Sequence, residues 1–269
     1  MEKILRKTRP DLSGSAGIAI LRPGSIVSFV GGGGKTSALF SLARRQRHPV
    51  LLTTTTKVGF NQVQTADRIL PPRDFLAEPE IGGESRVIWV SELPENGETR
   101  KISGISSADF TELARRAARL GYSILIEADG AHRRSIKAPE THEPVIPQET
   151  TAVAACIGLS VLGQPATDES VHRLVRYLDC VGGQPGDIIT EDSILRLVAH
   201  PEGSFKSTPD SAERILLLNQ ADNAALLDRA LKIADRALSA ASADRVWITR
   251  LNRGEWLCEM TRTVKKEVR

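Results

Sequence analysis

The sequence predicts an α/β fold of three layers, in which helices cover both faces of a mainly parallel β-sheet. Two observations support this prediction. Continuous aliphatic and β-branched runs, typical of strands buried on both faces, alternate with segments whose apolar residues recur at helical spacing. With 269 residues, of which 41% are hydrophobic, the chain can bury a sizeable core. Because no stretch has the composition of a linker, we predict one domain over residues 1–269.

The first half of the chain opens with a strand, a glycine-rich loop and a helix. SIVSFV at 25–30 is a continuous strand-type run, and apolar residues return at helical spacing after the glycines. PVLLTTTT at 49–56 predicts the second strand. RVIWVSEL at 86–93 predicts a strand that enters a turn at 94–97, with KISGIS at 101–106 as its return partner in a hairpin.

The second half continues the alternation. A helical face near 110–120 ends at Gly121, because glycine readily adopts the left-handed conformation of a helix end. The predicted strands are YSILIEADG (122–130), TAVAACIGLSVLG (151–163), RILLLNQAD (214–222) and DRVWIT (244–249). We interpret two helices within about 168–210 as an embellishment, and residues 252–269 as an edge hairpin.

Four glycines stand directly before Lys35 and Thr36 in SFVGGGGKTS. A phosphate-binding loop reads G-x-x-x-x-G-K-[ST], but Phe29 occupies the place of its first glycine, so only a shortened G-x-x-G-K-T is complete. Glycines let the backbone approach an anion, a helix start adds a positive dipole, a lysine reaches phosphates and a threonine hydroxyl can hold magnesium. The predicted nucleotide-binding residues of this loop are Gly31, Gly32, Gly33, Gly34, Lys35, Thr36 and Ser37.

A flexible turn between a strand and a helix is the alternative interpretation. It explains the glycines but not a lysine and a threonine at the start of the helix. The shortened loop also resembles the G-x-x-G-K-T loops of the Mur-type ligases. We therefore predict a phosphate-loop NTPase-like domain, in which Lys35 is an exposed loop residue that binds the β and γ phosphates and contributes little to the core.

Two carboxylates follow the apolar strand ILIEADG. Glu127 and Asp129 at a strand end beside a phosphate loop could hold magnesium and orient a water, since hard oxygen ligands suit that ion. We predict Lys35, Glu127 and Asp129 as catalytic residues, and Thr36 with Glu127 or Asp129 as magnesium ligands. The alternative is that both acids are simply solvated.

A third motif, LLLNQAD, resembles the N-K-x-D element of guanine-selective proteins. Asn219 and Asp222 match it, whereas Gln220 replaces the lysine whose stem packs over the base. We predict that Asn219 and Asp222 take part in nucleotide binding, with Asp222 accepting hydrogen bonds from guanine. The alternative is an ordinary helix cap by Asp222 or Asn223.

Polar residues elsewhere are candidates for contact with a substrate or partner. Thr56 and Lys57 follow a predicted strand close to the phosphate loop, although a run of threonines also simply favours a strand. Arg133, Lys137 and His142 stand on a proline-bounded segment that could equally be a solvated surface loop.

Composition excludes several classes of function. A net charge of +3 with the basic residues dispersed does not indicate nucleic-acid binding. Three cysteines without C-x-x-C spacing argue against a disulfide framework or a zinc site and favour a reducing compartment. The N-terminus lacks the apolar stretch of a signal peptide, and the longest apolar run, near 152–162, is too short to span a bilayer. We therefore expect a cytoplasmic protein without a membrane partner.

Several segments together resemble a known family. TTTTK (53–57), EADGAHRRSIKAPETHEPVIP (127–147), VHR (171–173) and FKSTP (205–209) resemble the selenium-dependent hydroxylase accessory proteins called YqeC, and the likeness covers roughly residues 24–222. This resemblance implies an accessory role in the maturation of molybdenum-containing hydroxylases, with a client hydroxylase or a cofactor-maturation protein as partner. The E-x-D-G element is also similar to a loop of GTPases that load metal centres in ureases and hydrogenases.

The motifs together predict a magnesium-dependent GTPase or ATPase. Two alternatives remain open from the sequence. One is a nucleotide-dependent docking module without useful turnover, and the other is a Mur-like ATP-dependent ligase or phosphotransferase in which the basic segment after Gly130 receives an acceptor.

Overall fold

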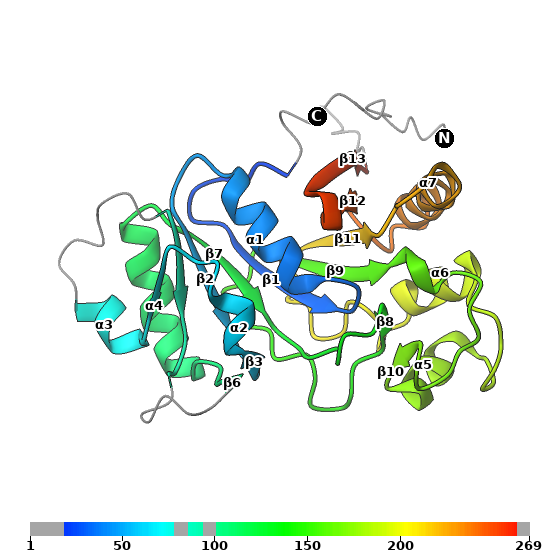
Figure 1. The fold of residues 1–269 in the computed structure, drawn as a ribbon, viewed down its shortest axis with the longest axis horizontal. Helices are drawn as coiled ribbons and strands as arrows, with labels where there is room; N and C mark the ends of the chain where they lie inside the picture. The colour runs from blue at the N-terminus through cyan, green and yellow to red at the C-terminus, as the bar shows by residue number, and fades with distance from the viewer. Residues whose placement is uncertain (1–18, 78–85, 94–100, 263–269) are drawn as a thin grey trace, which may run out of the picture.

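The computed structural model describes residues 19–77, 86–93 and 101–262. Its centre is a nine-stranded sheet with the strand order β13-β12-β11-β9-β1-β7-β2-β5-β4 (Figure 1). All neighbouring strands are parallel except β13, which pairs antiparallel with β12. The predicted α/β class with a mainly parallel sheet is thus confirmed.

The strands of this sheet are β1 (Ile26–Gly31), β2 (Val50–Thr54), β4 (Arg68–Leu70), β5 (Val87–Val90), β7 (Ser123–Glu127), β9 (Ala152–Gly158), β11 (Glu213–Asn219), β12 (Arg245–Arg250) and β13 (Glu255–Thr261). Two short ribbons accompany it: β3 (Val58–Gly59) with β6 (Lys101–Ile102), and β8 (Ile136–Lys137) with β10 (Val171–His172). The helices are α1 (Lys35–Arg45), α2 (Phe60–Val63), α3 (Pro72–Ala77), α4 (Ser107–Arg119), α5 (Leu174–Val181), α6 (Glu191–Ala199) and α7 (Ala224–Ser239), with single 3₁₀ turns η1 (Leu159–Val161) and η2 (Leu251–Arg253).

Helices lie on both faces of the sheet because its central strands are apolar on both sides. In β7, Leu125 packs into the hydrophobic cluster that contains α1, whereas Ile124 and Ile126 point to the opposite cluster, which contains α4, α5, α6 and α7. All five residues of β7 are buried. The continuous apolar run that indicated a doubly covered strand is therefore explained by this arrangement.

Strand β1 lies at the centre of the sheet, between β7 and β9. In the register of these strands, Phe29 lies opposite Glu127 and Gly31 opposite Cys156. Strand β11 is next to β9 and ends at Asn219. The loops that follow β1, β7, β9 and β11 consequently meet at one edge, where ligands of open α/β sheets usually bind.

The predicted hairpin of residues 86–106 is wrong in its pairing. Strand β5 lies in the main sheet, parallel to β2 and β4, whereas β6 pairs antiparallel with β3; one isolated antiparallel bridge, Glu92 with Ser103, joins the two segments. The reason is burial. All four residues of β5 are buried, as an inner strand requires, and the predicted turn at 94–97 lies outside the described residues.

At the C-terminal edge the sheet ends in a hairpin, but its bounds differ from the predicted 252–269. Residues 252–262 supply only one of its strands, β13, which pairs antiparallel with β12, while residues 263–269 lie outside the described part of the chain. Trp247 and Trp256 pack edge to face across this hairpin, at 5.4 Å between ring centres. Helices α5 and α6 fall within 168–210, preceded there by β10. Among the described helices, none combines the length and the apolar character needed to cross a bilayer.

Candidate functional site

The glycine loop between β1 and α1 is tightly packed rather than a loose joint. The N–H of Gly32 donates to the carbonyl of Cys156 at 2.9 Å, and that of Gly33 donates to the carbonyl of Arg134 at 2.9 Å. At Gly33, where φ is +78°, a Cβ atom would lie 2.2 Å from the backbone nitrogen of Gly158. A side chain is excluded there, so the glycine permits close contact between three backbone segments.

The hydrogen bonds of the loop decide which N–H groups are left to bind an anion. The N–H of Gly31 donates to Asp129 Oδ2 at 3.0 Å, so the first three glycines all donate to protein atoms. Within the described residues, the N–H groups of Gly34, Lys35, Thr36 and Ser37 have no protein acceptor, as expected at the start of a helix. Of the predicted loop residues 31–37, only 34–37 therefore have backbone N–H groups left to donate to a phosphate.

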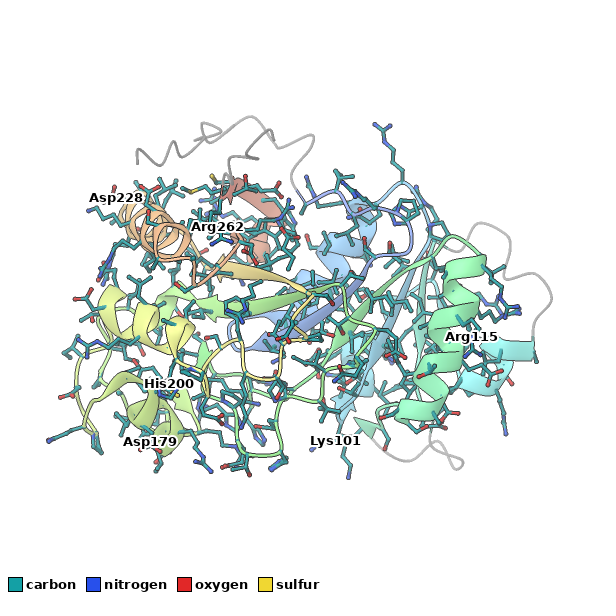
Figure 2. The ribbon with its side chains drawn as sticks, turned by 180° about the vertical axis from the view of Figure 1, so that it is seen from behind. Lys101, Arg115, Asp179, His200, Asp228 and Arg262 are labelled. Carbon is teal, nitrogen blue, oxygen red and sulfur yellow. The ribbon has the colours of Figure 1, made fainter. Side chains whose placement is uncertain are left out.

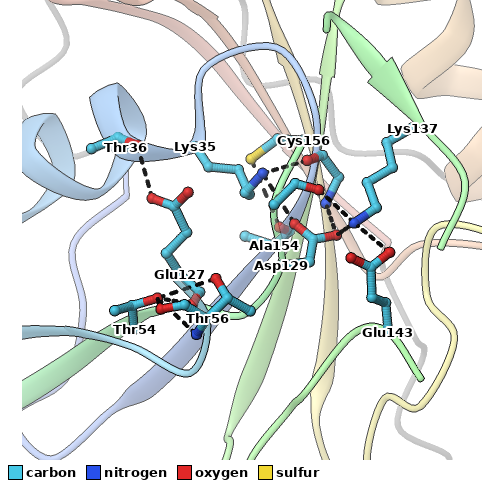
Figure 3. A network of polar contacts seen from close by, with 12 residues as sticks. Lys35, Thr36, Thr54, Thr56, Glu127, Asp129, Lys137, Glu143, Ala154 and Cys156 are labelled. Atoms are coloured by element: carbon cyan, nitrogen blue, oxygen red, sulfur yellow. Dashed lines mark hydrogen bonds and ion pairs between the residues drawn. The ribbon is translucent and has the colours of Figure 1, made fainter. Parts of the chain in front are cut away.

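Lys35 is buried, contrary to the expectation of an exposed loop residue. Only 5% of its surface is exposed. Its Nζ atom donates to the carbonyl of Gly31 at 2.5 Å and lies 3.0 Å from Asp129 Oδ1 (Figure 3). Burial lowers the pKa of the Lys35 ammonium, but the carboxylates of Asp129 and Glu127 outweigh that effect and raise it above its ordinary value. The lysine is thus charged and anchored beneath the loop.

Asp129 lies between two lysines and is 1% exposed. Lys137 Nζ lies 3.2 Å from Asp129 Oδ2 and 2.9 Å from Glu143 Oε2, and it donates to the carbonyl of Gly130 at 2.6 Å. Lys137 is itself buried, at 2%. Asp129 and Lys137 therefore belong to a buried ionic cluster behind the glycine loop, in which each charge has an oppositely charged partner within the protein.

Glu127 faces the other side of the loop. Its Oε2 atom accepts a hydrogen bond of 2.8 Å from the Thr36 hydroxyl, and its backbone carbonyl accepts one of 2.9 Å from the Thr54 hydroxyl (Figure 3). The N–H of Thr55 also donates to this carbonyl. Burial raises the pKa of the Glu127 carboxyl above its ordinary value, against the lowering effects of Lys35 and of the Thr36 hydrogen bond. Of the two predicted acids, Glu127 is the one placed beside Thr36.

The paired oxygens of Thr36 and Glu127 fit a magnesium ion that is bound together with a phosphate chain. Magnesium is commonly held by one or two protein oxygens, with substrate phosphates and waters completing its shell. The described residues contain no group of three or more His, Cys, Asp and Glu side chains that could hold a metal by themselves.

A cavity of about 580 Å³ opens at this point, which is within the range of small-molecule sites. The predicted residues that line it are Gly33, Gly34, Lys35, Thr36, Ser37, Lys57, Glu127 and Arg133. The predicted residues outside its lining are Gly31, Gly32, Thr56, Asp129, Lys137, His142, Asn219 and Asp222. Lining residues that the sequence prediction omitted include Asn61, Gln62, Lys101, Arg134, Ser135 and Gln220.

The N-Q-x-D segment contributes differently from its predicted role. Asn219 is buried, and its Nδ2 atom donates to the carbonyl of Gly33 at 2.7 Å, so it holds the glycine loop in place. Gln220 lines the cavity, and its Oε1 atom accepts from the N–H of Ser160 at 3.3 Å. Asp222 is exposed, whereas Asn223 caps α7 through the N–H of Leu226. The helix-cap alternative is therefore realised by Asn223.

The remaining predicted contact residues fall into two groups. Lys57 and Arg133 are exposed and line the cavity, whereas His142 is exposed elsewhere. Thr56 is half-buried, and its N–H donates to Thr54 Oγ1 at 3.0 Å, which shapes the end of β2. The structure thus brings Lys57 and Arg133, but not His142 or Thr56, to the lining of the cavity.

Two comparisons with known proteins agree with each other. A family model described as YqeC protein matches residues 27–175. The protein named "Uncharacterized protein YqeC" from Escherichia coli (strain K12) is 32% identical over 204 residues, which is 73% of this chain and 76% of that protein.

Proposed function

The chain belongs to the YqeC family, and from the geometry of its glycine loop we propose that it is a magnesium-dependent nucleotide-binding protein that hydrolyses GTP or ATP. The observation that carries this proposal is the run of N–H groups at 34–37, which have no acceptor within the described residues and stand at a cavity beside the Thr36 and Glu127 oxygens. The resemblance of the sequence to selenium-dependent hydroxylase accessory proteins supports a role in the maturation of molybdenum hydroxylases, with a client or maturation protein as partner in the cytoplasm.

In this proposal, different residues bind the phosphates, hold magnesium and orient the attacking water. The N–H groups of 34–37 hold the phosphate chain, and Lys35 adds positive charge from beneath it. Thr36 and Glu127 would hold magnesium, which when bound neutralises charge on the phosphates. Because Asp129 is paired with two lysines, Glu127 is the acid that remains to orient an attacking water.

Thermal unfolding with GTP or ATP, each with and without magnesium, tests the proposal. A nucleotide at a hundred times its dissociation constant should stabilise the fold by about 2.7 kcal/mol. Stabilisation that requires magnesium and is followed by phosphate release supports hydrolysis. Tight binding without phosphate release would instead indicate the docking module, and no stabilisation by either nucleotide would contradict the proposal.

Glu127→Gln is expected to separate metal binding from nucleotide binding. The amide keeps the size of the side chain and can still accept from Thr36, but it removes the negative charge that favours magnesium. We expect the magnesium concentration needed for half-maximal binding to rise about tenfold or more, and phosphate release to fall by roughly a hundredfold. The exposed Glu112→Gln on α4 is the matched control. Equal magnesium dependence in Glu127→Gln and the control would remove Glu127 from the site.

Asp222→Asn tests whether this residue reads the base. Because Asp222 is exposed and outside the lining of the cavity, we expect the affinities for GTP, ATP and XTP to change by less than about twofold. An aspartate that accepts from guanine would behave differently: its loss would move preference toward XTP by roughly five- to a hundredfold, the effect of about 1–3 kcal/mol. Competition binding with the three nucleotides distinguishes the two results, and a shift to XTP would restore the guanine assignment.

A further inference from the structure

Two stacked histidines stand at one side of the cavity beside the glycine loop. The ring centres of His132 and His172 lie 4.7 Å apart, and the rings are inclined by only 26°. His132 is exposed and lines the cavity together with Thr36 and Glu127. His172 is half-buried and lies outside the lining. Of the two rings, that of His132 can therefore touch a nucleotide in the cavity.

The loop that carries His132 is fixed to the glycine loop. The carbonyl of Arg134, two positions later, accepts from the N–H of Gly33 at 2.9 Å. At its start the loop follows Glu127, the acid that lies beside Thr36 at the end of β7. His132 consequently belongs to the phosphate end of the cavity, because its loop begins at the proposed magnesium ligands and contacts the glycine loop.

The backbone of His132 is in an unusual conformation. Its φ of 46° lies in the left-handed region that non-glycine residues rarely occupy. The N–H of Arg134 donates to the carbonyl of Ala131 at 2.9 Å and closes a turn around His132. Backbone conformations of this kind cluster at ligand sites, where the surrounding structure enforces them. His132 thus has a fixed backbone as well as a stacked ring.

His172 is itself held firmly. Strand β10 pairs parallel with β8, which places His172 opposite Lys137, and the carbonyl of His172 accepts from the N–H of Ala138 at 3.4 Å. Burial, and then the charge of Lys137, lower the pKa of His172 to about 4, so this ring is neutral at neutral pH. A neutral ring can support His132 without charge repulsion.

The ring nitrogens of His132 are available to a ligand. Within the described residues, neither nitrogen makes a hydrogen bond or an ion pair. Two neighbours on the loop differ in this respect. Arg134 Nε donates to the carbonyl of Asp168 at 2.9 Å, and the hydroxyl of Ser135 lies 2.9 Å from another hydroxyl.

Arg133 also lines the cavity, but its side chain is not fixed. No hydrogen bond, ion pair or aromatic ring in the described part of the chain holds its guanidinium. Donors that are held in place before the reaction stabilise a transition state best, because no reorganisation then opposes their action. Arg133 is therefore suited to general attraction of phosphate, whereas His132 is suited to a contact that strengthens in the transition state.

We propose that His132 is a catalytic residue of nucleotide hydrolysis, whose ring N–H donates to an oxygen of the terminal phosphate during its transfer, and that His172 is the positioning residue that supports it. This inference rests on the proposed function and deepens it. In the reaction, the oxygen of water bonds to the γ phosphorus, and the bond from that phosphorus to the β–γ bridging oxygen breaks. The leaving diphosphate takes the electron pair, and the protons of the water pass to the released phosphate and to solvent.

The first test compares two complexes of the full chain in calorimetry. One contains magnesium and a non-hydrolysable triphosphate, and the other contains magnesium, the nucleoside diphosphate and aluminium fluoride, which imitates the phosphate in transfer. His132→Ala should weaken the aluminium fluoride complex and lower kcat for phosphate release by about a hundredfold each, while the affinity for the triphosphate changes by less than about threefold. His142→Ala, on an exposed histidine outside the cavity lining, is the matched control.

The second test concerns the stacked pair. His172→Ala removes the supporting ring and should lower kcat about tenfold, whereas His172→Phe keeps an aromatic ring and should remain within about threefold of the parent. His200→Ala is the control, because His200 is a half-buried histidine at the end of α6, outside the cavity lining (Figure 2).

The outcomes separate this inference from the proposed function. A parent protein that binds no nucleotide, or that binds it without phosphate release, contradicts the proposed hydrolysis, and the inference fails with it. In a parent that hydrolyses nucleotide, equal results for His132→Ala and His142→Ala overturn the role of His132 alone. A higher KM with unchanged kcat would mean ground-state binding and would also overturn it. A loss of kcat in His172→Phe as large as in His172→Ala overturns the positioning role.

Discussion

Replacing Lys35 with methionine is expected to abolish nucleotide binding and to lower the free energy of unfolding by about 3 kcal/mol. The first effect follows from removal of the positive charge beneath the phosphate loop. The second follows from burial, because Lys35 and Asp129 are 5% and 1% exposed and their charged atoms lie 3.0 Å apart. Lys137 continues to neutralise Asp129, which keeps the loss at the lower end of the range for a broken buried pair.

Thermal unfolding with and without nucleotide measures both effects of the Lys35 substitution. The loss of stability corresponds to a fall of roughly 6–12 °C in Tm for a domain of this size. Lys232→Met, on an exposed lysine of α7, provides the control for a change of the same chemistry without burial. A Lys35→Met protein that binds nucleotide as well as the parent would show that the loop is not a phosphate site.

A second substitution separates the two roles of Lys35. In Lys35→Met/Asp129→Asn the neutral amide no longer needs a cation, and Lys137 keeps its contact with Glu143 at 2.9 Å. Stability should therefore recover in part, while nucleotide binding should remain absent. Recovery of both properties would mean that the single variant lost binding only because its fold was weakened.

The buried ionic cluster behind the loop explains why the E-A-D segment alone does not distinguish the roles of its two acids. Glu127 is the last residue of β7, and Asp129 follows two positions later, so both were candidates for the same metal. Their partners differ because Thr36 stands on one side of the loop and Lys137 on the other. Lys137 is distant in sequence from Lys35, and only the folded chain shows that one carboxylate joins them.

The strand, loop and helix around the glycines could be predicted because their signals are local. Apolar runs identify β1 and β2, and helical spacing identifies α1, without knowledge of any distant residue. The hairpin prediction failed where two local signals disagreed. The turn-like residues after β5 favour a hairpin, whereas its continuous apolar run indicates the inner parallel strand that the structure shows.

The contacts that shape the site were less accessible to prediction. The sequence predicts nucleotide binding for Asn219, but its side-chain amide donates to the carbonyl of Gly33, which lies 186 positions earlier in the chain. The carbonyl partners of Gly32 and Gly33 belong to Cys156 and Arg134. Because every residue has a backbone carbonyl, the residue type does not indicate which carbonyl accepts a hydrogen bond, and these contacts cannot be predicted from a single sequence.

Gly33→Ala is expected to destabilise the protein by about 3–5 kcal/mol, because two separate costs combine. The residue has φ +78°, and its Cβ would lie 2.2 Å and 2.6 Å from the nitrogen and Cα of Gly158 and 2.9 Å from the carbonyl oxygen of Ser135. These are backbone atoms in a region fixed by hydrogen bonds, so they cannot rotate away as a side chain could. Displacing them would also move the N–H groups of 34–37 and weaken nucleotide binding.

Gly163→Ala is the matched control, since Gly163 has φ +88° but an added Cβ would meet nothing within 4 Å. It carries the cost of the left-handed backbone alone, about 1–2 kcal/mol. The difference between the two variants in urea unfolding therefore measures the close packing of the glycine loop, which we expect to contribute about 2 kcal/mol or more. Equal losses in the two variants would mean that the loop yields to a side chain, as a flexible joint would, and that its N–H groups are not held ready for phosphate.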